Sequence, residues 1–245
     1  MMTRLGGALL LGLVLSMAAV AQHAGGEGMQ LEPANNDVTD VESLQRGAKY
    51  FVNYCLGCHS AQYVRYNRVG ADLGLTDDQV VENLMFTGER PFDTMQNAMQ
   101  SQDAVRWFGV APPDLSLIAR SRGTDYIYNF LRGFYADESK TTGANNVWLA
   151  NTAMPHVLWQ LQGVRGLVTE GEGEAAEQHF EVLRPGSMNE AEFDETVRDI
   201  VNFLDYIGEP MQVERRALGV RVIAFLLLFL IISYMLKREI WKDVH

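Results

Sequence analysis

The sequence predicts an all-α domain followed by a single membrane-spanning helix near the C-terminus. In several segments, apolar residues recur every three or four positions, which is the period of an amphipathic helix. No segment alternates apolar and polar residues for long enough to predict a sheet, although residues 141–162 are ambiguous. A strongly apolar run without charge at residues 222–236 has the composition of a membrane-spanning helix.

The N-terminus has the features of a secretory signal peptide. Arg4 precedes an apolar run at residues 5–20, and residues 19–21 (AVA) form the small-x-small pattern at which a signal peptidase cleaves. We therefore expect a signal peptide at residues 1–21. An uncleaved N-terminal anchor is the alternative interpretation.

The first helices of the domain are marked by their capping residues. Residues 22–39 contain Gly and Asn and few apolar side chains, which predicts a flexible lead-in before a domain at residues 40–213. Asp40 is a candidate N-cap for an amphipathic helix over residues 41–51. A second helix is expected to begin at Thr76, which is followed by two aspartates.

Two later segments also predict helices. Residues 125–135 are rich in aromatic side chains and predict a third helix. Residues 187–207 carry one continuous apolar face and acidic residues in the first turn, and they form the clearest helical pattern of the domain. We expect this last helix to cross the first one.

The apolar run near the C-terminus is long enough for a membrane anchor. Residues 222–236 would span about 22 Å as a helix, and extension to Leu218 gives about 28 Å, close to the roughly 30 Å of a bilayer core. Arg221 then lies near one end, where its side chain can reach the interface. The predicted membrane helix is 217–236.

The orientation of this anchor follows from the signal peptide, because the basic residues flanking the anchor are balanced on its two sides. Export of the N-terminus places the domain in the periplasm and leaves residues 237–245 as a cytoplasmic tail. The expected location is the cytoplasmic (inner) membrane, crossed once.

The domain is strongly acidic. Residues 22–213 contain 28 Asp and Glu against 13 Lys and Arg, a formal charge of −15. This charge excludes nucleic acid as a plausible partner and favours encounter with a cationic protein. One stretch contains five glutamates and no Lys or Arg, and is either a solvated insertion or a docking surface for a basic protein. These residues are Glu170, Glu172, Glu174, Glu177 and Glu181.

The motif Cys55-Leu56-Gly57-Cys58-His59 is the sequence at which a c-type haem is covalently attached. Cys55 and Cys58 would bond the porphyrin, and His59 would bind the iron. These are also the only cysteines in the chain. A redox-active pair is the remaining alternative, whereas a zinc site would need a second pair of ligands that the sequence does not contain.

An electron carrier needs a second axial ligand, and several methionines are candidates. Met154 is favoured because it precedes Pro155 in a stretch that reads as a loop. Met95 and Met99 remain open from spacing, and His156 is a weaker alternative. Three others fit a core or linker position better. They are Met85, Met188 and Met211.

From Leu44 to its C-terminus, the chain resembles cytochrome c1, the haem subunit of the quinol–cytochrome c reductase (cytochrome bc1) complex. The most specific segments are YCLGCHSAQYVRYNRV at 54–69, APPDLSLIARSRG at 111–123, DYIYNFLRGFY at 125–135 and the pair Met154-Pro155. The resemblance implies a class I cytochrome c-like domain with one haem c. The site residues it implies are Cys55 and Cys58 for attachment, His59 and Met154 as iron ligands, Pro112 and Pro113 at the haem edge, and Arg122 and Tyr126 at the propionates.

The function implied by the resemblance is electron transfer, with no enzymatic activity of the chain on its own. Electrons would pass from a Rieske iron–sulfur protein to a soluble cytochrome c, and a cytochrome b would be the membrane partner. An anchored cytochrome that serves a terminal oxidase or a nitric oxide reductase is the main alternative. A haem enzyme or gas sensor with an open sixth iron position, and a structural subunit without haem, are further hypotheses.

Overall fold

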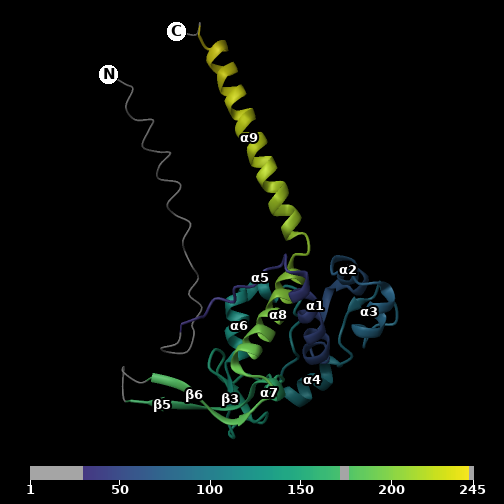
Figure 1. Cartoon of the computed structure of the whole chain (residues 1–245), viewed down its shortest axis with the longest axis vertical. Helices are drawn as coiled ribbons and strands as arrows, with labels where there is room; N and C mark the ends of the chain where they lie inside the picture. Colours follow the sequence, from purple (N-terminus) through teal and green to yellow (C-terminus); the bar gives the residue numbers. More distant parts are fainter. Residues whose placement is uncertain (1–29, 172–176, 243–245) are drawn as a thin grey trace.

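The computed structural model describes residues 30–171 and 177–242 of the 245-residue chain. A globular part contains helices α1 to α8, and helix α9 projects from it as a separate rod (Figure 1). A long hairpin extends sideways from the end of the globular part that is farther from α9 (Figure 1). The predicted signal peptide, 1–21, lies outside the described residues.

The helices of the globular part are short except for the last one. In chain order they are α1 (Val41–Tyr50), the π-helical turn η1 (Phe51–Cys55), α2 (Tyr66–Asp72), α3 (Asp77–Asn83), α4 (Ser101–Phe108), α5 (Ile118–Arg122), α6 (Thr124–Arg132), α7 (Trp159–Gln162) and α8 (Glu190–Gly208).

The helix starts follow the capping residues. The Asp40 carboxylate accepts the Ser43 backbone N–H at 3.0 Å and begins α1, as predicted. Thr76 forms a capping box with Gln79 at the start of α3, which confirms the helix expected there. An equivalent box begins α8 at Asn189.

The expectation of an all-α domain is incomplete, because the described residues contain three antiparallel two-stranded ladders. The ladders are β1 (Ala61–Arg65) with β2 (Thr94–Met95), β3 (Phe134–Ala136) with β4 (Ala144–Asn146), and β5 (Gly163–Glu170) with β6 (Glu177–Pro185).

The sequence does not predict the β5–β6 hairpin, and the reason is physical. Most of the β5 side chains are half-buried, and those of β6 are mostly exposed, so neither strand shows an apolar face with period two. Backbone pairing and cross-strand contacts hold the hairpin instead. Glu170, Glu177 and Glu181 lie on its strands, whereas Glu172 and Glu174 lie outside the described residues.

The segment before α1 is docked on the domain along residues 32–37, although the sequence predicted a flexible lead-in up to residue 39. The Ala34 N–H donates to the Asp125 carboxylate at 2.8 Å, and the Arg198 side chain donates to the Ala34 carbonyl oxygen at 2.9 Å. Ala34 itself is fully buried. The physical reason is that polar partners on α6 and α8 satisfy a backbone whose own side chains carry little apolar signal.

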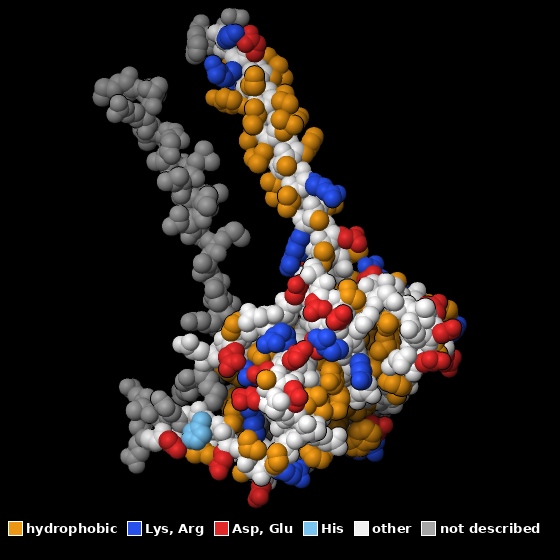
Figure 2. Space-filling view, viewed as in Figure 1, with side chains coloured by type: hydrophobic (Ala, Val, Ile, Leu, Met, Phe, Trp, Pro, Cys, Tyr) orange, Lys and Arg blue, Asp and Glu red, His pale blue; other side chains and the backbone are white. Residues whose placement is uncertain are grey.

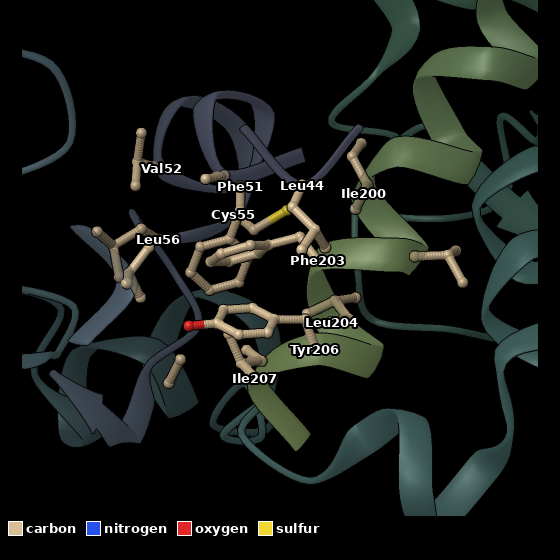
Figure 3. Packing of buried hydrophobic residues seen from close by; sticks show 14 of the residues in the cluster. Leu44, Phe51, Val52, Cys55, Leu56, Ile200, Phe203, Leu204, Tyr206 and Ile207 are labelled. Carbon is tan, nitrogen blue, oxygen red and sulfur yellow. The ribbon is translucent and has the colours of Figure 1, made fainter. Parts of the chain in front are cut away.

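Helices α1 and α8 cross in the core, as the sequence predicted. Gly47 permits the close approach, because a Cβ at this position would lie 2.1 Å from the Asp199 carbonyl oxygen. Figure 3 shows Phe51 and Phe203 packed against each other next to the crossing, and their ring centroids are 5.4 Å apart. The buried Asp199 carboxylate accepts from Ser43 at 2.7 Å and from Arg46 at 2.6 Å.

Helix α9 (Gln212–Ile240) contains the whole predicted membrane span. It is the one helix among the described residues that is long and apolar enough to cross a membrane, and no other described part of the chain buries its apolar stretch. Figure 2 shows apolar side chains around the middle of this helix and charged side chains near both ends. The arrangement fits a membrane anchor.

Candidate functional site

A cavity of about 310 Å³ lies in the domain between the Cys-x-x-Cys-His motif and helices α6 and α8. This volume is in the range of pockets that hold cofactors. All eight site residues predicted from the sequence line it. They are Cys55, Cys58, His59, Pro112, Pro113, Arg122, Tyr126 and Met154.

The two cysteines lie at the end of η1 and in the turn that follows it. The backbone N–H groups of Cys58 and His59 both donate to the Cys55 carbonyl oxygen, at 3.0 and 2.8 Å, and this tight turn presents both thiols to the cavity. The thiols are free and do not form a disulfide. Burial raises the pKa of Cys55 to about 12 and also raises the pKa of Cys58, whereas a redox-active pair has a lowered thiol pKa.

The imidazole of His59 is oriented by one hydrogen bond. Its Nδ1 lies 2.7 Å from the Pro113 carbonyl oxygen, which can only accept, so Nδ1 carries the proton and Nε2 is the ring nitrogen left for a metal. Burial lowers the pKa of His59, although the Pro113 bond and the Asp114 charge act in the opposite direction. The ring is therefore neutral near pH 7, which is the form that binds iron.

Met154 is the one methionine, among those in the described residues, that lines the cavity. Met95 is fully buried on β2, and Met99 lines a second, polar cavity of about 130 Å³ beside residues 111–114. His156 does not line the main cavity, because its ring stacks parallel on the Phe134 ring with centroids 5.1 Å apart. The structure thus brings Met154 to the site and leaves the alternatives elsewhere.

The remaining candidate methionines serve other positions. Met85 belongs to the buried core, and Met188 packs against that core. The Met211 sulfur accepts a hydrogen bond from Arg68 at 3.3 Å, next to the start of α9. None of the three lines the cavity.

Arg122 and Tyr126 lie together at the cavity, and the guanidinium carbon of Arg122 is 5.6 Å from the Tyr126 ring centroid. Arg120, two residues earlier, forms an ion pair with Glu209 at 3.5 Å and does not line the cavity. A cation and a phenol at the rim can bind carboxylates of a cofactor.

Several lining residues were not identified from the sequence. Ile200 and Leu204 reach the cavity from α8, where their helical spacing had marked only a core face. Phe108, Val110 and Leu149 come from the end of α4 and from loops. No motif marks these three, since their role depends on which loops the fold brings together.

The residues at the cavity fit a covalently bound haem. Two free thiols three positions apart, an imidazole nitrogen and a thioether sulfur supply both attachment atoms and two iron ligands of the right chemical type. Most of the other lining side chains are apolar, as a porphyrin face requires.

Comparison with known proteins agrees with this geometry. Over 97% of its length, the chain is 46% identical to a cytochrome c1 of Allochromatium vinosum, covering 99% of that protein. It is 44% identical to a Nitrosomonas europaea protein named ammonia monooxygenase gamma subunit, over 95% of this chain and 97% of that one. A Candida albicans protein named as the catalytic subunit of the mitochondrial cytochrome b-c1 complex is 26% identical over 94% of this chain and 83% of its own.

The family model described as the Cytochrome C1 family matches residues 34–244, which include most of the docked segment, the whole cavity and helix α9. This match covers most of the chain, and the relatives with cytochrome c1 names extend over nearly the same length. The chain therefore belongs to the cytochrome c1 family.

Proposed function

We propose that this chain carries electrons singly from a Rieske iron–sulfur protein to a soluble cytochrome c. The family to which it belongs consists of electron-transfer subunits of the membrane-bound cytochrome bc1 complex, which carry c-type haem and are not enzymes on their own. The proposal adds the donor, the acceptor and the residues that hold one haem.

One observation supports the proposal above all others. Eight residues from four separate stretches of the sequence line a single cavity, and these residues include two thiols, one imidazole and one thioether. Burial in a mostly apolar cavity suits a group that must change oxidation state with little solvent reorganisation.

The residues would have distinct tasks. Cys55 and Cys58 would bond the haem covalently, with His59 and Met154 as its axial ligands. When bound, the haem supplies reversible one-electron redox chemistry. The hydrogen bond to Pro113 keeps the His59 ring in one orientation.

The other predicted residues would shape the surroundings of the haem. Pro112 and Pro113 line the cavity, where their rings would limit the access of water to the haem edge. Arg122 would offset carboxylate charge, and Tyr126 beside it would complete the polar rim.

We also propose the membrane arrangement. The signal peptide at residues 1–21 would direct the domain to the periplasm, α9 would cross the membrane once, and residues 237–245 would remain in the cytoplasm. A cytochrome b and a Rieske protein would be the membrane partners. The acidic domain favours a cationic cytochrome c as acceptor.

The deciding experiment is purification of the full-length chain from its own membranes in mild detergent, followed by spectra of the oxidised and reduced sample. We expect one c-type haem per chain, b-type haem and a Rieske signal in the same preparation, and reduction of the c-type haem by added quinol. A preparation with c-type haem but without b-type haem or a Rieske centre would contradict the proposed donor.

The same experiment tests whether the chain belongs to a different membrane enzyme, a question raised by the relative named ammonia monooxygenase gamma subunit. A chain that belonged to a different membrane enzyme would be isolated with that enzyme, and quinol would not reduce its haem. The site itself supports electron carriage in either complex, because its chemistry depends on residues of this chain alone.

A further inference from the structure

The loop that orients His59 has no regular secondary structure of its own. Residues 109–115 form neither helix nor strand. Pro112 and Pro113 lack backbone N–H groups, so the loop cannot be held through hydrogen bonds donated at those positions. The position of the Pro113 carbonyl relative to His59 must therefore be set by neighbouring residues.

Asp114 supplies this connection through both oxygens of its carboxylate. Its Oδ2 accepts the backbone N–H of Gln62 at 3.0 Å, and its Oδ1 accepts the backbone N–H of Ser116 at 2.8 Å. One bond thus reaches the strand that follows the haem-attachment motif, and the other closes the turn after the two prolines. The carboxylate joins the two segments directly beside the bond between Pro113 and His59.

Two further hydrogen bonds connect the same segments. The Leu115 N–H donates to the Ser60 carbonyl oxygen at 2.7 Å, and the Tyr63 N–H donates to the Ser116 hydroxyl oxygen at 3.1 Å. Ser116 is buried. We call residues 60–63 together with residues 114–116 the clasp. It contains no regular ladder between the segments, so side chains provide bonds that a sheet would have made through the backbone.

We infer that Asp114, assisted by Ser116, is a positioning residue for His59, because it holds the Pro113 carbonyl where it accepts the imidazole proton. This inference rests on the function proposed above. It assigns a role to a residue that is not itself part of the lining of the main cavity.

The clasp should lower the reduction potential of a haem whose iron is bound by His59. A firm bond from Nδ1–H to the Pro113 carbonyl makes the imidazole a stronger donor, which favours the oxidised iron. The negative charge of Asp114 acts in the same direction, since oxidation adds one positive charge close to His59. Loss of either effect raises the reduction potential.

The test is Asp114→Asn in the full-length protein, with Ser116→Ala as a second variant that keeps the carboxylate charge. In D114N, we expect the ratio of oxidised to reduced haem at a fixed solution potential to fall by about two- to tenfold, where tenfold equals about 59 mV for one electron. In both variants, we expect the hyperfine-shifted NMR resonances of the haem methyls and the His59 ring to move.

Asp93→Asn is the matched control, because Asp93 also accepts two backbone N–H groups, at 3.0 and 2.9 Å, in a loop that does not line the cavity. We expect D93N to leave both the reduction potential and the hyperfine-shifted NMR resonances as in the wild type. A changed potential with unchanged NMR resonances in D114N and S116A would reduce Asp114 to a charge effect and overturn the positioning role. If D114N failed to assemble, S116A alone would test the positioning role. Unchanged resonances of the haem methyls and the His59 ring in S116A would then contradict it.

The outcomes separate this inference from the proposed function. A wild-type protein without haem at Cys55 and Cys58 would contradict the proposed function itself. A wild-type protein with a normal haem, and variants that match it in potential and resonances, would contradict the role of the clasp alone.

Discussion

Met154 is the residue proposed as the second iron ligand. The residue lies in a loop next to Pro155, and its backbone N–H lies 3.4 Å from the Thr152 hydroxyl. Neither of these features belongs to a helix or a strand. Thioether ligation opposite histidine raises the potential of a haem and closes the sixth position to other ligands.

Met154→Ala should therefore change both the potential and the reactivity of the site. We expect the reduction potential to fall by on the order of 0.1 V, within the roughly 0.8 V range that axial ligands span, and the reduced protein to bind carbon monoxide. Redox titration and reduced spectra with carbon monoxide measure these changes. Met99→Ala, in the polar cavity, is the control and should retain the wild-type potential. Wild-type behaviour of the Met154 variant would disprove the ligand assignment.

At the scale of secondary-structure elements, the close packing of α1 against α8 depends on Gly47. Gly47 lies on α1 against the backbone of α8, so the absence of a side chain decides how closely the helices pack. The crossing also carries Asp199, whose buried carboxylate is held by Ser43 and Arg46 of α1. The close approach at Gly47 and the hydrogen bonds of Asp199 therefore hold α1 and α8 in the same relative position.

Gly47→Ala is expected to destabilise the domain by about 1–3 kcal/mol, because overpacking outweighs the roughly 0.5–1 kcal/mol that alanine contributes in a helix. For a domain of this size, each kcal/mol lowers the melting temperature by about 2–4 °C. Thermal unfolding followed by circular dichroism measures the change. Gly219→Ala, on α9, is the helical control, since a Cβ added at this position would meet no described neighbour within 4 Å. Equal melting temperatures for the two variants would show that the crossing tolerates a side chain.

The Arg165 side chain is one of the contacts that attach the β5–β6 hairpin to the domain. Its guanidinium donates to the Arg132 carbonyl oxygen and lies 3.9 Å from the Phe180 ring centroid. Burial and the like charge of Arg132 lower its pKa to about 10, so the side chain remains a cation at neutral pH. The Arg165 side chain thus connects the base of the hairpin to the end of α6.

Arg165→Met should loosen the hairpin without altering the haem site. A charge-assisted hydrogen bond contributes about 1.5–3 kcal/mol, so amide hydrogens of β5 and β6 should exchange about tenfold to a hundredfold faster. Hydrogen exchange with mass spectrometry measures this. Arg184→Met is the control, because that exposed arginine lies near the same end of the ladder but stacks over the Trp159 ring instead of binding the end of α6. Unchanged protection would show that the strand pairing alone holds the hairpin.

At the scale of the whole molecule, the charge of the domain should govern its encounter with an acceptor. Residues 22–213 carry a formal charge of −15, and the hairpin carries Glu170, Glu177 and Glu181 on its strands. A field of this sign accelerates association with a cation and is screened beyond about 8 Å at physiological ionic strength.

Replacement of these three hairpin glutamates by glutamine should slow the reduction of a basic cytochrome c about two- to tenfold at low salt and weaken its dependence on ionic strength. Stopped-flow kinetics over a range of salt concentrations measure both effects. The control replaces Asp78, Glu82 and Glu89 by their amides, because this equal change of charge lies in and near α3, away from the hairpin (Figure 1). The same loss of salt dependence in both triple variants would show that only net charge matters.

The sequence by itself determined the features that depend on neighbours along the chain. The Cys55 to His59 motif follows from fixed covalent spacing, and the caps at Asp40 and Thr76 follow from local hydrogen bonds. The period of α8 and the apolar run of α9 identified the longest helices, because a helix repeats its pattern over many residues.

Only the tertiary structure decided which distant residues meet. It brought Met154 rather than Met95 or Met99 to the cavity and directed Arg122 to its rim, while Arg120 turned to Glu209. It also revealed the β5–β6 hairpin, the docked segment at residues 32–37 and the clasp around Asp114. Each of these depends on contacts between segments that no local periodicity encodes, since loop backbones are held by whichever partners the fold supplies.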